Sequence, residues 1–164
     1  MVPRDLKGDF LYPLNQLRDI YPELYLAKSQ KYQGRERLMR EIIQPLSCLW
    51  NDVLHFTAVH PKEINQALTS TGFKSLDCDF FEIDAELLEK DQTCVYLYDD
   101  YEVRNYVEYK IEDLNKYSFA PKETLGHYEK TKKLGERPLL FIRIPHILYK
   151  GKIDLKKTKR ISIN

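Results

Sequence analysis

The chain has 164 residues, of which 43% are hydrophobic and 31% charged, and its formal net charge is +1. This length suits one domain, 1–164, and the hydrophobic share is too high for a disordered protein. No apolar run approaches the ~20 residues that span a bilayer, so we expect no membrane partner.

The cysteines and the first residues bear on the compartment. Cys48, Cys78 and Cys94 are widely spaced, odd in number and without a CxxC pair. That usage indicates reduced thiols, not a disulfide framework or a zinc ribbon. Residues 1–5 lack the apolar stretch of a secretory signal. Together these features favour a cytoplasmic protein.

Residues 1–45 are predicted to be mostly helical. The apolar side chains of 14–21 have helical spacing, and Pro22 suits the first turn of a second helix. A third helix is predicted over 35–43, with Pro45 as its stop.

Strands and short helices alternate irregularly after this segment. Strands are predicted over 53–58, 80–83, 94–98, 106–111, 139–144 and 152–163, and helices over 61–71, 85–90 and 121–134. Pro61 and Gly72 mark the ends of the first of these helices, Asp84 suits a cap of the second, and the third is polar and expected to be exposed. Because no regular βαβ rhythm appears, we predict an α+β fold, in which helical residues 1–45 pack on a core of 46–164 with a mixed, mainly antiparallel sheet.

Charge is unevenly distributed along the chain. Residues 77–113 hold 3 basic and 13 acidic side chains, whereas 114–164 hold 13 basic and 4 acidic ones. One interpretation is that the two segments lie together and neutralise each other. Another is that the basic end binds nucleic acid, with some of the 12 tyrosines stacking on bases.

Common catalytic and metal-binding motifs are absent from the sequence. The histidines His55, His60, His127 and His146 do not have the spacing of a zinc site, and no HExxH occurs. The phosphate-binding glycine loops and the Gly-x-Ser-x-Gly elbow are also missing. We therefore expect no metal, no P-loop or Rossmann nucleotide site and no α/β-hydrolase chemistry.

The predicted strand 53–58 carries two polar side chains on one face. His55 and Thr57 alternate with the apolar residues Leu54, Phe56 and Ala58. In one interpretation, His55 is a core residue bonded to a backbone carbonyl and Thr57 caps the following turn. In the other, the pair lines a cleft and binds a nucleotide-like small molecule.

These residues carry a resemblance to a known family. His55-Phe56-Thr57, followed by a helix and by Gly72-Phe73, resembles the opening of the ADP-ribosyltransferase superfamily, in which a His-x-Thr strand precedes a helix and a glycine. Residues 144–155, Ile-Pro-His-Ile-Leu-Tyr-Lys-Gly-Lys-Ile-Asp-Leu, are similar to the ending of small bacterial domains grouped with that superfamily. Phe-Glu-Ile-Asp at 81–84 resembles the strand that precedes a short helix in those domains.

The resemblance implies an enzyme, or a degenerate relative of one, that binds NAD. His55 then bonds the nicotinamide ribose, Tyr96 or Tyr98 stacks on nicotinamide, and Glu136 is the catalytic acid by its order in the chain. Thr57 and His146 are expected to help bind the ligand.

A non-catalytic function also fits the sequence. The charge-segregated chain suits a protein-interaction module whose partner carries the opposite charge. Three hypotheses therefore remain open: an ADP-ribosyltransferase-like enzyme or relative, an interaction module, and a nucleic-acid-binding protein.

Overall fold

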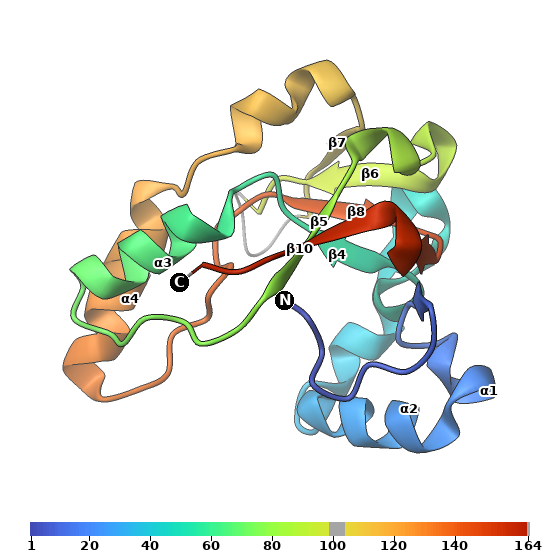
Figure 1. Ribbon diagram of the computed structural model, residues 1–164, viewed down its shortest axis with the longest axis horizontal. Helices are drawn as coiled ribbons and strands as arrows, with labels where there is room; N and C mark the ends of the chain where they lie inside the picture. The colour runs from blue at the N-terminus through green and yellow to red at the C-terminus, as the bar shows by residue number, and fades with distance from the viewer. Residues whose placement is uncertain (99–103, 164) are drawn as a thin grey trace.

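The computed structural model describes residues 1–98 and 104–163, and its helices and antiparallel sheets confirm the α+β class (Figure 1). The central sheet has four antiparallel strands in the order β4-β8-β6-β7. Their bounds are Leu54–Phe56 (β4), Thr93–Tyr96 (β6), Tyr106–Glu108 (β7) and His146–Tyr149 (β8).

Three two-stranded antiparallel pairs accompany the central sheet within the described residues. They are β1 (Phe10–Leu11) with β9 (Ile153–Asp154), β2 (Ile42–Ile43) with β3 (Cys48–Leu49), and β5 (Phe80–Ile83) with β10 (Thr158–Ile161). Figure 1 shows the last pair, which we call the β5–β10 ribbon, crossing in front of strands β4 and β8.

The helical elements are mostly short. The α-helices are α1 (Leu17–Ile20), α2 (Pro22–Ser29), α3 (Pro61–Ser70) and α4 (Lys122–Leu134). The 3₁₀ turns are Gln30–Tyr32, Glu36–Arg40, Gln44–Leu46, Trp50–Asp52, Ala85–Leu87, Lys90–Gln92, Ile111–Tyr117 and Leu155–Lys157. Within the part of the chain that the structure describes, no helix has the length and apolar content to cross a membrane.

The two faces of the central sheet pack against different parts of the chain. Residues directly opposite each other in an antiparallel pair share a face, so the pairs Phe56–Ile147 and Ile147–Val95 place these three side chains together. They pack into the cluster that includes Tyr109 and Ile83, which we call the ribbon side. The opposite face packs on a second core formed by residues 43–53 together with Leu148 and Cys94.

Local signals explain helix α3. Pro61 occupies the first turn, and the His60 side chain accepts a hydrogen bond from the Lys62 amide. The helix ends one residue earlier than predicted, and Gly72 follows it with a φ of +85°, as the αL cap requires. The buried residues Ile64, Ala67 and Leu68 form its inward face.

The N-terminal segment is less helical than its spacing predicts. Pro22 begins α2 as expected, but the helix predicted over 35–43 is wrong. A 3₁₀ turn occupies Glu36–Arg40, and Ile43 then pairs with Cys48 in a short strand. Tertiary packing decides this outcome, because the Ile43 side chain is fully buried beneath the central sheet.

The strand predicted over 139–144 is also wrong, because these residues form successive turns. Their carbonyl groups bond to helix α4 instead of to a strand partner: Thr124 Oγ1 donates to the Ile142 oxygen at 2.8 Å, and the Tyr128 hydroxyl donates to the Leu140 oxygen. Helix α4 was expected to be exposed, yet its Thr124, Tyr128 and Thr131 are buried. Polar side chains thus form the inward face of this helix.

Two further predicted elements are shortened or divided. Asp84 caps the turn at 85–87 by accepting from the Glu86 amide, as predicted, but the helix stops there. The strand predicted over 152–163 is divided into β9 and β10 by a 3₁₀ turn.

The acidic middle and the basic end of the chain meet in the β5–β10 ribbon. Lys159 Nζ lies 3.6 Å from a Glu82 carboxylate oxygen, and Arg160 Nη2 lies 2.5 Å from an Asp79 carboxylate oxygen. The acidic residues Asp99, Asp100 and Glu102 lie outside the described residues. These two ion pairs support the interpretation in which the segments neutralise each other.

Candidate functional site

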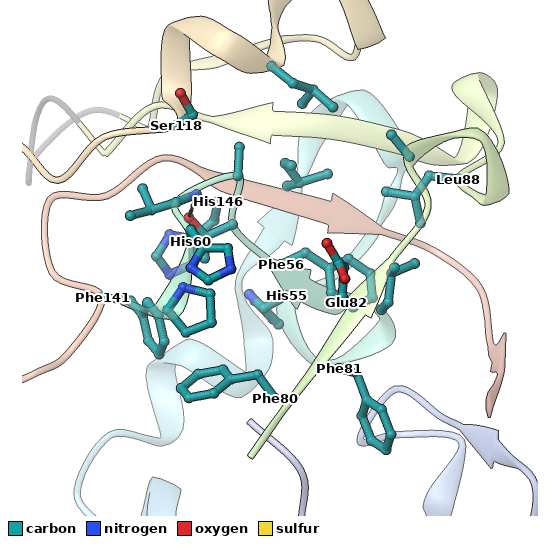
Figure 2. A pocket seen from close by; sticks show the side chains of 18 of the residues that line it. His55, Phe56, His60, Phe80, Phe81, Glu82, Leu88, Ser118, Phe141 and His146 are labelled. Carbon is teal, nitrogen blue, oxygen red and sulfur yellow. Dashed lines mark hydrogen bonds between the residues drawn. The ribbon is translucent and has the colours of Figure 1, made fainter. Parts of the chain in front are cut away.

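An open pocket of about 400 Å³ lies between the central sheet and the β5–β10 ribbon. Strands β4 and β8 supply one wall, the ribbon supplies another, and the start of α3 and the turn Ile111–Tyr117 complete the lining. In Figure 2 the rings of His60, Phe80 and Phe141 gather at one end, while Glu82 and Leu88 lie towards the other. The volume is that of pockets for small ligands.

His55 is a wall residue of this pocket. Its Nε2 lies 3.1 Å from the carbonyl oxygen of Trp50, and because a carbonyl only accepts, Nε2 carries the proton. The residue remains accessible to solvent, and the register places its ring on the face of β4 opposite Phe56, where the Trp50 ring packs 4.7 Å away, centroid to centroid. Burial among protein atoms, assisted by the nearby His146, lowers the pKa of His55 to about 3. The imidazole is therefore neutral, with Nδ1 as a hydrogen-bond acceptor.

His146, at the start of the neighbouring strand β8, is a second neutral imidazole in the wall. Its Nδ1 donates to the Ile144 carbonyl oxygen at 2.6 Å, which leaves Nε2 as the acceptor. Burial lowers the pKa of His146 most, the Ile144 hydrogen bond opposes this, and the positive charge of Arg104 lowers it further. The rings of His55 and His146 are 6.2 Å apart, centroid to centroid. Within the described chain, neither acceptor nitrogen has a hydrogen-bond partner.

Thr57 lies just beyond the end of β4, which is shorter than the predicted strand. Its Oγ1 accepts a hydrogen bond from the Val59 amide at 3.1 Å, so it stabilises the turn that leads to α3. Both of the structural roles weighed from the sequence are therefore present: His55 bonds a carbonyl and Thr57 caps a turn. Both residues also line the pocket.

An aromatic cluster shares with these histidines the sheet face opposite the ribbon side. We use this name for Trp50, Tyr96, Tyr98 and Tyr106, whose rings contact one another and the two histidines at centroid distances between 4.7 and 6.3 Å. The Tyr98 ring stacks on His146 at 5.6 Å and an interplanar angle of 25°. Four predicted site residues, His55, Tyr96, Tyr98 and His146, are thus brought together.

Arg104 binds this cluster to the N-terminal segment. Its Nη1 donates to the Tyr96 hydroxyl at 2.7 Å, and its Nη2 donates to a Glu41 carboxylate oxygen at 2.9 Å. The guanidinium also lies 5.3 Å from the Trp50 ring centroid and 5.0 Å from that of Tyr96. Sequence reasoning missed both Arg104 and Glu41, and their separation of 63 positions offered no local signal.

The structure separates Glu136 from the other predicted catalytic residues. It follows the α4 cap Gly135 on an exposed turn, and its amide donates to the Thr131 carbonyl. Glu136 does not line the pocket, whereas Glu82 on β5 does. Tyr96 is fully buried, which leaves no room for a ligand ring against it. In the described part of the chain, no group of three or more His, Cys, Asp or Glu side chains is placed to share a metal ion.

Further polar side chains line the pocket. They include His60, Asn115 and Ser118 besides the residues described above, and apolar and aromatic side chains make up most of the rest. Such a lining offers several donors and acceptors on an apolar surface, the usual composition of a specific small-molecule pocket. A comparison of the chain with protein-family models, with curated proteins and with solved structures found no match.

Proposed function

We propose that this protein binds a small planar heteroaromatic ligand of the kind found in nucleotides, a nucleobase or a nicotinamide ring, in the pocket beside β4. One observation carries the proposal: two histidines on adjacent strands belong to the lining of the same pocket, and in each of them a backbone carbonyl fixes one ring nitrogen as the donor, so that the other is an acceptor.

The chemistry of the wall matches such a ligand. Amino and amide N–H groups of nucleobases and of nicotinamide donate hydrogen bonds, and His55 Nδ1 and His146 Nε2 are acceptors. The aromatic rings of Phe80 and Phe141 line the same pocket and offer apolar surface to a flat ring. A ligand whose N–H groups pair with these acceptors is favoured over one that has no donor.

ADP-ribosyl transfer is the second candidate. It is supported by His55 and Thr57, which line the pocket as the resemblance to that superfamily implies. It lacks a carboxylate in the expected position, because Glu136 lies outside the lining. Release of nicotinamide from NAD by the wild type, lost in His55→Ala, would establish the enzyme; binding without release would identify a relative that only binds.

The remaining alternatives have weaker support. The ion pairs of Lys159 and Arg160 with acidic residues of the same chain reduce the charge available to polynucleotide phosphates. A reducing, cytoplasmic compartment is supported by the three free cysteines.

Ligand-induced stabilisation tests the proposal directly. Adenosine, uridine and nicotinamide are added separately to the protein, and the unfolding midpoint and the heat of binding are measured. A ligand present at 100 times its Kd stabilises the folded state by ~2.7 kcal/mol. We expect one of these ligands to stabilise the wild type.

Two histidine variants make the test specific. His55→Ala removes a wall residue, whereas His127→Ala removes a histidine on α4 that does not line the pocket. We expect the ligand effect to be lost in the first variant and retained in the second, with circular dichroism confirming that both fold. The proposal would be refuted if no ligand stabilised the wild type and His127→Ala. It would also be refuted if a ligand stabilised His55→Ala as much as the wild type.

A further inference from the structure

We infer that the pocket selects uncharged ligands, the free base, nucleoside or nicotinamide, and rejects their phosphorylated or anionic counterparts. This inference rests on the proposed function and names the ligand class of the same site.

The first argument is the charge of the lining. Glu82 is the charged side chain among the lining residues of the described chain, and no lysine or arginine side chain lines the pocket. Proteins bind phosphate and carboxylate groups with arginine and lysine, or with free backbone amides. An anion that enters this pocket would lose its hydration, meet a carboxylate and find no cationic side chain to replace the water.

The second argument concerns the start of helix α3, which also borders the pocket. A helix N-terminus attracts anions through its free amides. Here Pro61 has no N–H, the Lys62 amide donates to the His60 side chain, and the Glu63 amide donates to the His60 carbonyl. The amides of Lys62 and Glu63 are thus already bonded within the helix cap and are not free for an anion. The Glu63 carboxylate, in the first turn, adds a negative charge.

The third argument is the protonation of the wall. The pKa values of His55 and His146 are both lowered, chiefly by burial, so neither imidazole supplies a positive charge near neutral pH. Two other cations lie near the lining. Lys159 pairs with Glu82. The α-amino group belongs to Met1, itself a lining residue, and burial lowers the pKa of this group, which favours its neutral form.

Matched ligand pairs provide the test. Nicotinamide and nicotinate have nearly the same shape and differ by one negative charge, and adenosine differs from adenosine 5′-monophosphate by the phosphate. Affinities are measured by calorimetry at pH 8, where an ordinary histidine is neutral. For the pair whose neutral member binds, we expect the anion to bind about tenfold or more weakly.

Two matched variants test whether Glu82 causes the difference in affinity between neutral and anionic ligands. Glu82→Gln removes the carboxylate of the lining, and Glu86→Gln makes the same change at an exposed residue that does not line the pocket. The affinity gap between neutral and anionic ligands should narrow in Glu82→Gln and stay unchanged in Glu86→Gln.

The outcomes distinguish the two proposals. Equal or tighter binding of the anion by the wild type overturns the selection for uncharged ligands and leaves the proposed pocket function standing. An affinity gap that is the same in Glu82→Gln as in the wild type also overturns it, because the carboxylate of the lining would then not cause the selection. Failure of every neutral ligand to bind overturns both.

Discussion

Tyr98 and Arg143 both adopt a left-handed backbone with a φ of 61°, and the Arg143 Nη1 donates to the Tyr98 carbonyl oxygen at 3.3 Å. Non-glycine residues seldom occupy this region, and such strain persists where surrounding contacts hold it. One residue follows β6 and the other precedes β8, so the link lies at the end of the sheet where Tyr98 stacks on His146. The strained pair therefore helps to hold one wall residue of the pocket.

The backbone strain at Arg143 predicts a difference between two substitutions. Arg143→Asn and Arg143→Val both remove the guanidinium, but asparagine tolerates the left-handed region and a β-branched valine does not. The valine variant should be less stable than the asparagine variant by ~1–2 kcal/mol in urea unfolding. The same two changes at the exposed Arg137, whose φ is not positive, should differ much less. Equal stability of the two Arg143 variants would contradict this account.

Stability should fall on acidification because of the two wall histidines. Unfolded histidine has an ordinary pKa of about 6.5, whereas burial lowers that of His55 to about 3 and also lowers that of His146. Between these values the unfolded chain binds more protons, so the stabilisation is complete above about pH 7 and is lost as the pH falls through 6.5 towards 3. Because His55 reaches solvent, its contribution should stay below ~1.4 kcal/mol per pH unit.

Urea unfolding at pH 7.5, 6.5 and 5.5 measures this dependence. His55→Gln keeps a donor for the Trp50 carbonyl and removes the titrating ring, so its stability should depend less on pH than that of the wild type. Carboxyl groups contribute to both proteins alike and cancel in the comparison. Identical slopes would show that His55 titrates in the same way in the folded and unfolded states.

The Arg104–Glu41 pair should stabilise the fold more than an exposed ion pair does. The two side chains are only 28% and 17% exposed and are joined by more than one contact. A double-mutant cycle with Arg104→Met and Glu41→Gln should give a coupling free energy of ~1–3 kcal/mol. The Lys90–Glu108 pair, with side chains 67% and 55% exposed, is the matched control and should couple by less than ~1 kcal/mol. Similar coupling in both cycles would refute the prediction.

Two glycine substitutions should change stability in opposite directions. A Cβ at Gly151 would overlap the ring of Tyr149, which is buried, so Gly151→Ala should destabilise the protein by ~1–3 kcal/mol. Gly126 lies within α4 with open space around it, and Gly126→Ala should stabilise by ~0.5–1 kcal/mol. Thermal or urea unfolding measures both, and a neutral Gly151→Ala would show that the Tyr149 ring moves aside freely.

The sequence predicted elements where short-range signals suffice. Strand β5 has the predicted bounds, Pro61 and Gly72 delimit α3 to within one residue, and Asp84 caps its turn. Each of these depends on a proline, a glycine or a capping side chain within a few positions.

The errors arose where distant contacts decide the structure. The apolar run at 139–144 resembles a strand, but its carbonyls bond to Thr124 and Tyr128 on α4. Ile43 lies in a strand, although its spacing predicts a helix, because its side chain is buried under the central sheet. No local pattern reports such competition between partners.

The candidate site was predicted in part. The alternation of His55 and Thr57 indicated two residues that line the pocket, and His146 lines it too. The catalytic role of Glu136 stays a prediction with no counterpart in the lining. The ribbon wall, with Glu82 and Phe80, was not foreseen, because it depends on how β5 and β10 cross the sheet.

Trp50 is the only tryptophan of the chain, and its indole packs 4.7 Å from the imidazole of His55, which lines the pocket. The emission of an indole changes with the polarity and protonation of its immediate surroundings. The protein therefore carries its own optical reporter beside a residue of the candidate pocket. The binding of candidate ligands can be tested in real time, without a label, by the light emitted from this single known position.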